Sequence, residues 1–175
     1  MVGREFNVGK DDNLYAATPP LEALRYVLSY AGTWGDGSSE RRAVMINDVR
    51  RAYFYARATR VLYVELPRED PEYGQSDKVG RLRLCLYGTR DSALNWQETL
   101  SEHLLTLGFK RGVGFPSVFV NSELDIWTLA HGDDCCSAGR PEAPAWLELR
   151  LAEKYEIKTQ RIGHRPKCSA NGQIV

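Results

Sequence analysis

Residues 124–138 read Leu-Asp-Ile-Trp-Thr-Leu-Ala-His-Gly-Asp-Asp-Cys-Cys-Ser-Ala, and this stretch decides the fold. Two strand-like halves flank Gly132-Asp133, a glycine-first pair favoured in two-residue type II′ turns. The pattern predicts an antiparallel hairpin whose tip carries adjacent carboxylates, Asp133 and Asp134. Acidic residues are depleted in strands, so this placement indicates either a polar turn or a functional site.

A second acidic residue ends another apolar segment. Residues 43–49, Ala-Val-Met-Ile-Asn-Asp-Val, have the composition of a short buried strand that delivers Asp48 near its end. Clustered carboxylates raise one another's pKa unless a cation compensates, and magnesium prefers carboxylate ligands combined with substrate phosphate oxygens. Together Asp48, Asp133 and Asp134 therefore predict a magnesium site. The alternative is that Asp48 is only a helix cap.

The roles of the three aspartates are not expected to be equal. Consecutive strand residues point to opposite faces of a sheet, so Asp133 and Asp134 cannot both face a metal in the same way. We expect Asp48 and Asp133 to be the main ligands, with Asp134 as a weaker or supporting one. Two magnesium ions at such a site would support in-line phosphoryl transfer, and Mn²⁺ is the alternative metal.

The remaining pattern predicts an α+β fold. Apolar residues at helical spacing follow Pro19-Pro20, with Leu21, Leu24, Val27 and Leu28 on the expected buried face. Asp91 or Ser92 is expected to cap a second helix, which Gly108 ends. Further segments are assigned by the same periodicities: helices over residues 91–107 and 141–154, and strands over residues 61–66, 81–87, 118–121, 124–131, 135–138 and 155–159.

Length and composition are those of one globular domain. The 175 residues contain 23 Lys and Arg against 23 Asp and Glu, with 43% hydrophobic residues. No apolar run approaches the roughly 20 residues of a membrane span, and the N-terminus has no signal-peptide pattern. We therefore expect an intracellular protein, cytoplasmic or nuclear, with no membrane partner. The four cysteines are expected to be free thiols, since their spacing does not fit zinc.

The zero net charge conceals two opposed segments. Residues 41–60 contain six arginines against Asp48 alone, whereas residues 121–156 contain three basic residues against eight acidic ones. Arginine pairs with phosphate in a bidentate way, so the basic segment favours a nucleic-acid partner. Residues expected to form the nucleic-acid track are Arg41, Arg42, Arg81 and Arg83.

Six segments in one order resemble the reverse transcriptase of copia-type retrotransposons, across roughly residues 14–163. The first resembles motif A of reverse transcriptases, and the fifth resembles the box that carries the paired aspartates. They are Asp48-Val49-Arg50-Arg51-Ala52-Tyr53; Leu86-Tyr87-Gly88 with Trp96; Leu107-Gly108-Phe109-Lys110; Pro116-Ser117-Val118-Phe119-Val120; His131-Gly132-Asp133-Asp134; and Glu153-Lys154-Tyr155-Glu156-Ile157-Lys158.

The resemblance implies an RNA-directed DNA polymerase domain: a palm with partial fingers over residues 1–163, incomplete at both ends, and a loose tail over residues 164–175. It implies an antiparallel sheet that carries the catalytic aspartates and packs on helices. Its partners would be RNA or DNA template-primer, deoxynucleotide triphosphates, and other pol segments such as integrase and RNase H. The residues carried over are Asp48, Asp133 and Asp134 as metal ligands; Tyr53 as the gate that excludes a 2′-hydroxyl; and Val49, Arg50, Arg51, Ala52 and Gly88 beside the nucleotide.

Several positions depart from the family pattern. His131-Gly132 replaces an aromatic-led pair before the aspartates, and Asp91 replaces a glutamine near the triphosphate. These changes and the incomplete ends put efficient catalysis in doubt. One alternative is an inactive remnant that binds nucleic acid or protein. Another is an unrelated metal-dependent nuclease or phosphotransferase, which would not need Tyr53.

Overall fold

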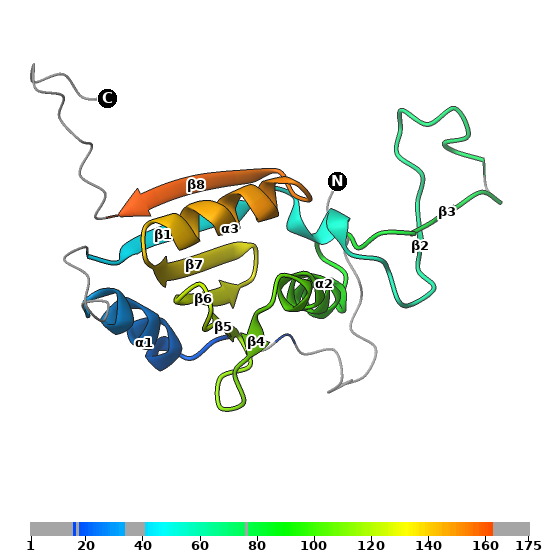
Figure 1. Ribbon diagram of the computed structural model, residues 1–175. Helices are drawn as coiled ribbons and strands as arrows, with labels where there is room; N and C mark the ends of the chain where they lie inside the picture. The colour runs from blue at the N-terminus through cyan, green and yellow to red at the C-terminus, as the bar shows by residue number, and fades with distance from the viewer. Residues whose placement is uncertain (1–15, 17, 34–40, 76, 163–175) are drawn as a thin grey trace, which may run out of the picture.

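The computed structural model describes residues 16, 18–33, 41–75 and 77–162 (Figure 1). In this part of the chain, six strands form one antiparallel sheet in the order β4-β5-β6-β7-β1-β8. Strands distant in sequence therefore lie side by side at β7, β1 and β8. The bounds are β1 (Ala43–Val49), β4 (Lys110–Arg111), β5 (Val118–Asn121), β6 (Ile126–His131), β7 (Asp134–Gly139) and β8 (Ile157–Ile162).

Alternation along the strands gives the sheet two apolar faces, each covered by helices. Met45 and Val49 of β1 belong to the core under α2 (Ser92–Thr106) and α3 (Glu142–Ala152). Val44 belongs to the smaller core under α1 (Leu21–Ala31). Helices α2 and α3 bury, on their side, Trp96, Leu100, Leu104, Ala143, Leu147 and Leu151.

The helix after the two prolines forms as predicted, but its buried face is different. Ala23 and Val27 are fully buried against the sheet, whereas Leu21 and Leu28 are 56% and 44% exposed. The small side chain of Ala23 lets the helix approach the strands closely. The larger leucines on either side therefore remain at the edge of the contact.

The strands expected over residues 61–66 and 81–87 are much shorter than predicted. Only β2 (Tyr63–Val64) and β3 (Gly80–Arg81) pair, in a ribbon of their own that projects from the sheet (Figure 1). The two segments are otherwise joined by scattered bonds, such as that from the Leu82 N–H to the Leu62 carbonyl at 2.9 Å. A two-stranded ribbon has no neighbouring strand to extend its ladder, so the apolar alternation alone did not predict its length.

Several local expectations are confirmed. The strand over residues 43–49 has the predicted bounds, the hairpin forms, and the architecture is α+β with an antiparallel sheet. Cys85, Cys135 and Cys136 are free thiols. The fourth cysteine, Cys168, and the tail over residues 164–175 lie outside the described residues. No helix in the described part is both long and apolar enough to cross a membrane.

Candidate functional site

Asp48 and Asp134 lie directly opposite each other on β1 and β7. Directly opposed residues of an antiparallel pair project from the same face, with β-carbons about 4.5–5.5 Å apart. The same register continues outward on both sides, because Asp134 is opposite His131 of β6 and Asp48 is opposite Lys158 of β8. Four strands therefore form one row in which two carboxylates lie between two basic residues.

Asp133 occupies the turn of the hairpin rather than a ladder position. Gly132 has φ +60°, while Asp133 is not among the residues with positive φ. This combination matches the predicted type II′ turn, in which only the first central residue needs a positive φ. The expectation that the two aspartates differ is thus consistent with the geometry, but it is Asp134 that faces Asp48.

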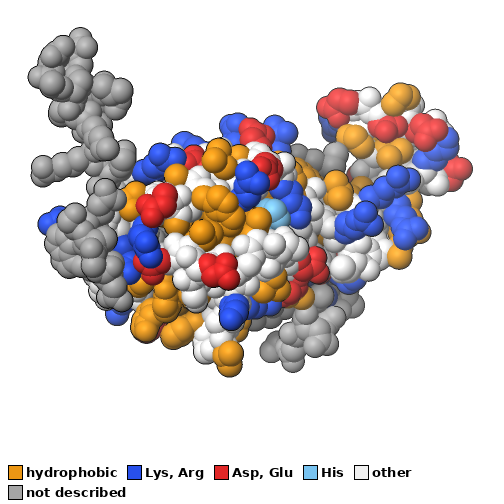
Figure 2. All heavy atoms as spheres, viewed as in Figure 1, with side chains coloured by type: hydrophobic (Ala, Val, Ile, Leu, Met, Phe, Trp, Pro, Cys, Tyr) orange, Lys and Arg blue, Asp and Glu red, His pale blue; other side chains and the backbone are white. Residues whose placement is uncertain are grey.

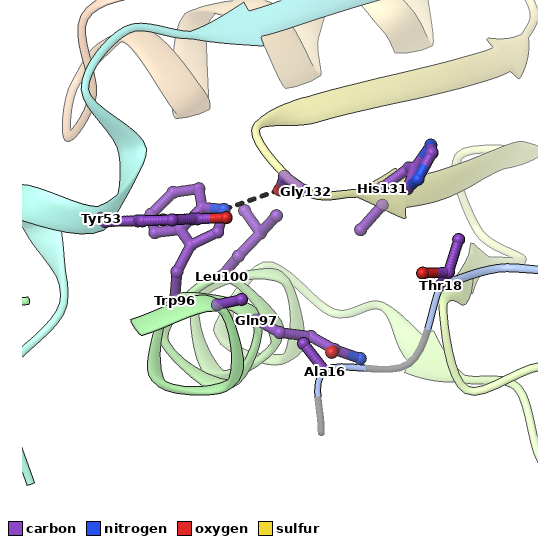
Figure 3. A pocket seen from close by; sticks show the side chains of 10 residues that line it. Ala16, Thr18, Tyr53, Trp96, Gln97, Leu100, His131 and Gly132 are labelled. Atoms are coloured by element: carbon purple, nitrogen blue, oxygen red, sulfur yellow. Dashed lines mark hydrogen bonds between the residues drawn. The ribbon is translucent and has the colours of Figure 1, made fainter. Parts of the chain in front are cut away.

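Both carbonyl groups of the turn are held by residues outside the hairpin. The Val49 N–H donates to the Asp133 carbonyl at 2.8 Å, which joins the turn to the end of β1. The indole N–H of Trp96 donates to the Gly132 carbonyl at 2.7 Å (Figure 3). Helix α2 and strand β1 therefore position the tip that carries the paired aspartates.

The carboxylates influence one another electrostatically. Partial burial is the main cause of the raised pKa of Asp134, and the charges of Asp133 and Asp48 raise it further, while His131 lowers it. Repulsion of this kind is what a divalent cation relieves, and carboxylate oxygens are the donors that magnesium prefers. The donor set thus fits magnesium by its chemistry. Within the described part of the chain, however, no three His, Cys, Asp or Glu residues form a ready-made metal cage.

Tyr53 lies on the short 3₁₀ helix η2 (Ala52–Tyr55) that follows β1. Its ring stacks on Tyr87 with centroids 4.2 Å apart and an interplanar angle of 21°. Burial, and then the charge of Asp133, raise the pKa of Tyr53, and the same two causes lead the raised pKa of Tyr87. Tyr53 therefore lies within electrostatic reach of the hairpin tip. The sequence alone assigned no role in the site to Tyr87, which is the stacking partner of Tyr53.

Tyr53 and the hairpin both line a small cavity of about 180 Å³ (Figure 3). Its wall combines apolar and polar groups contributed by η2, α2 and β6. Both Trp96 and Leu100 belong to it as buried side chains of α2. The full lining is Ala16, Thr18, Tyr53, Ala93, Trp96, Gln97, Leu100, Ala130, His131 and Gly132.

The residues between Asp48 and Tyr53 are held tightly. Val49 and Ala52 are fully buried, and the Arg50 N–H donates to the Glu156 carbonyl at 2.8 Å. The Arg50 side chain also forms an ion pair with the Glu156 carboxylate. Arg51 has a left-handed backbone, with φ 56° and ψ 38°, and its side chain is exposed.

The predicted nucleic-acid track needs one correction. The Arg42 side chain is only 8% exposed, pairs with Asp125 at 3.1 Å and lies over the Tyr30 ring at 4.1 Å. It also donates to the Thr33 hydroxyl. Arg42 therefore stabilises the packing of α1 on the sheet and does not offer a guanidinium to a partner. Arg41 is exposed beside it.

The other predicted track residues, Arg81 and Arg83, line a hollow of about 880 Å³ with Arg57 and Arg60. Arg57, Arg81 and Arg83 have no ion-pair partner among the described residues, in contrast to Arg60. Figure 2 shows Lys and Arg side chains gathered on the ribbon side of the molecule. The hollow adds Arg57 to the predicted track, because the fold brings this arginine beside Arg81 and Arg83.

Asp91, which departs from the family pattern, forms an ion pair with Arg60. Asp91 is 2% exposed, and the Arg60 guanidinium binds it at 2.8 Å. Burial by itself would raise the pKa of this carboxyl, but the hydrogen bond from Arg60 and its positive charge help to lower the pKa below its ordinary value. Asp91 is the N-cap residue of α2, one of the two positions predicted for the cap, but its side chain makes no capping hydrogen bond. Gly88 forms an exposed turn with φ +93° before it.

Comparison with known proteins finds relatives of this chain among transposon polyproteins. No protein-family model matches the chain. Curated Gag-Pol polyproteins of copia-type retrotransposons do, and the chain is homologous to part of them. This similarity supports the retrotransposon origin that the sequence predicted.

The particular relatives are Ty1 polyproteins of Saccharomyces cerevisiae (strain ATCC 204508 / S288c). The truncated transposon Ty1-A Gag-Pol polyprotein is 38% identical over 118 residues, which cover 66% of this chain and 9% of the relative. The transposon Ty1-DR5 and Ty1-LR2 Gag-Pol polyproteins have the same identity over 118 residues, with 66% of this chain and 6% of each relative covered. The chain spans less than a tenth of the length of these relatives.

Proposed function

We propose that this chain is the palm-centred part of an RNA-directed DNA polymerase from a copia-type pol polyprotein. The observation that carries the proposal is the register of β1 and β7, which sets Asp48 opposite Asp134 with Asp133 at the adjoining turn. Three acidic residues from two distant segments therefore stand at the same end of the sheet. Homology to Ty1 Gag-Pol polyproteins supports the same origin.

The reaction is the addition of a deoxynucleotide to a primer. The primer 3′-hydroxyl oxygen bonds to the α-phosphorus, the bond from that phosphorus to the pyrophosphate oxygen breaks, and the hydroxyl proton passes to a water molecule. Asp48, Asp133 and Asp134 are the residues that would hold magnesium. Bound magnesium supplies activation of the hydroxyl and neutralisation of the leaving pyrophosphate. Lys158, opposite Asp48, offsets part of the carboxylate charge.

The chain's own residues would bind and orient the nucleotide. Tyr53, supported by its stack on Tyr87, lies under the sugar and leaves no room for a 2′-hydroxyl. The exposed Arg51 side chain is available to the triphosphate, whereas Arg50 is paired with Glu156. The arginine-lined hollow, with Arg81 and Arg83, binds phosphates of the nucleic acid.

Primer extension tests the proposal. Purified chain is supplied with an annealed RNA template and DNA primer, deoxynucleotides and Mg²⁺, and extended products are resolved on a gel. We expect extension that Asp133→Asn and Asp48→Asn each reduce at least roughly a hundredfold, since each removes a metal-ligand charge. Asp77→Asn, which changes an exposed acid of the ribbon, is the matched control. Extension that survives in Asp133→Asn contradicts the proposed role.

A non-catalytic remnant that binds nucleic acid is the second candidate. It is favoured by one observation: the three aspartates form no ready-made cage in the described residues. It predicts salt-sensitive binding of the same template-primer without extension, at every Mg²⁺ or Mn²⁺ concentration. Extension by the unmodified chain excludes it.

A further inference from the structure

The tip of the β6–β7 hairpin carries the paired aspartates on a turn that begins with glycine. A glycine has no side chain to restrict its backbone, so Gly132 by itself leaves the tip loosely defined. Nothing lies within 4 Å of the place where a β-carbon of Gly132 would stand. Contacts from outside the hairpin therefore help to fix the turn that carries Asp133.

Two such contacts reach consecutive carbonyl groups of the turn. The Val49 N–H holds the Asp133 carbonyl, and the Trp96 indole N–H holds the Gly132 carbonyl. The first comes from the neighbouring strand and the second from α2. Only the second is made by a side chain, so it can be removed by substitution without altering the backbone.

Trp96 is itself rigidly placed. It is 1% exposed in the core under α2, and its ring meets the Tyr155 ring edge-on with centroids 5.2 Å apart. The indole N–H is a donor only, and a buried donor needs an acceptor. The Gly132 carbonyl is that acceptor, and Figure 3 shows the bond spanning from α2 to the hairpin tip.

We propose that Trp96 is a positioning residue that fixes the hairpin tip, and thereby Asp133 and Asp134, through its indole N–H. This inference rests on the proposed function for its catalytic consequence. Trp96 touches neither nucleotide nor primer in this assignment. It acts through the Gly132 carbonyl and replaces the restraint that a bulkier residue at position 132 would supply.

Amide hydrogen exchange measured by NMR tests the positioning itself, whatever the activity. In Trp96→Phe, which keeps an aromatic ring but has no donor, we expect the amides of residues 132–134 to exchange roughly tenfold faster. The amides in the middle of β6 should keep their rates. Trp127→Phe is the matched control, because Trp127 packs on Tyr26 and Tyr30 in the other core. Equal tip rates in unmodified chain and Trp96→Phe overturn the proposal.

Metal binding tests the consequence. Manganese is titrated into the full chain and followed by electron paramagnetic resonance. We expect Trp96→Phe to weaken binding roughly fivefold to tenfold, Trp127→Phe to leave it unchanged, and Asp133→Asn to abolish it. If Trp96→Phe binds Mn²⁺ as tightly as the unmodified chain, Trp96 is only a core residue and the proposal fails. If the unmodified chain binds no Mn²⁺, the proposed function fails, and the exchange rates still decide whether Trp96 fixes the tip.

Discussion

Asp48 and Asp134 face each other across β1 and β7, at the end of the sheet where the hairpin turns. They belong to a row that His131 begins and Lys158 ends. Two like charges at this separation destabilise the folded chain unless a cation is present. The paired carboxylates therefore lower the stability of the folded chain and create a site that attracts positive charge.

Replacing Asp134 tests this repulsion. The pKa of Asp134 is raised in the folded chain, so the folded state holds its proton more tightly than the unfolded state does. Stability is then greatest below the unfolded pKa and falls as the pH rises through the raised folded pKa. We expect Asp134→Asn to raise the free energy of unfolding at pH 7 by a few tenths of a kcal/mol, since solvent screens an exposed side chain. Urea unfolding at pH 7 and pH 3, with Asp77→Asn as control, measures it; an equal gain at both pH values contradicts the explanation.

Substitutions of Arg42 and Arg140 compare a buried arginine with an exposed one that binds the same carboxylate. Both bind Asp125, but the Arg42 side chain is 8% exposed and the Arg140 side chain is 55% exposed. We expect Arg42→Gln to lower the free energy of unfolding by about 2–4 kcal/mol, because it removes a nearly buried guanidinium that binds Asp125 and covers the Tyr30 ring. Arg140→Gln should cost less than about 1 kcal/mol. Thermal unfolding compares the two, and similar losses would refute the assignment of Arg42 to the core.

The arginine-lined hollow predicts a change in salt dependence. We expect Arg81→Gln and Arg83→Gln each to weaken binding of single-stranded RNA or DNA at every sequence, and to reduce the slope of log affinity against log salt by about 0.7. Fluorescence anisotropy over a range of salt concentrations measures both. Arg150→Gln, whose half-buried side chain is already paired with Glu153, should leave the slope unchanged. A slope unaffected by both Arg81→Gln and Arg83→Gln would exclude the hollow from the binding surface.

Substitution of Tyr53 distinguishes a polymerase from a metal-dependent nuclease or phosphotransferase. In Tyr53→Val the ring beside Tyr87 is lost, so we expect the preference for deoxynucleotides over ribonucleotides to fall roughly tenfold or more. Tyr53→Phe keeps the ring and should keep the preference. Single-nucleotide incorporation with each substrate gives the ratio, and an unchanged ratio in Tyr53→Val removes the gate assignment.

Much of the architecture was predictable from local patterns. The strand over residues 43–49, the hairpin with its glycine-first turn and the helices around Trp96 and Leu147 all form as expected. Their signals are short in range: alternation in strands, three-to-four spacing in helices and turn chemistry. The predicted lengths of the two ribbon strands were wrong, because strand length depends on neighbouring strands that the sequence does not reveal.

The sequence by itself determined that Asp48, Asp133 and Asp134 stand at strand ends, and that arginines gather before Tyr53. Only the tertiary structure decided that Asp134 faces Asp48 between His131 and Lys158, that Trp96 holds the turn, and that Arg42 is buried. The reason is register. It is set between segments distant in the chain, and a slip of one residue would move every side chain of a strand to the opposite face.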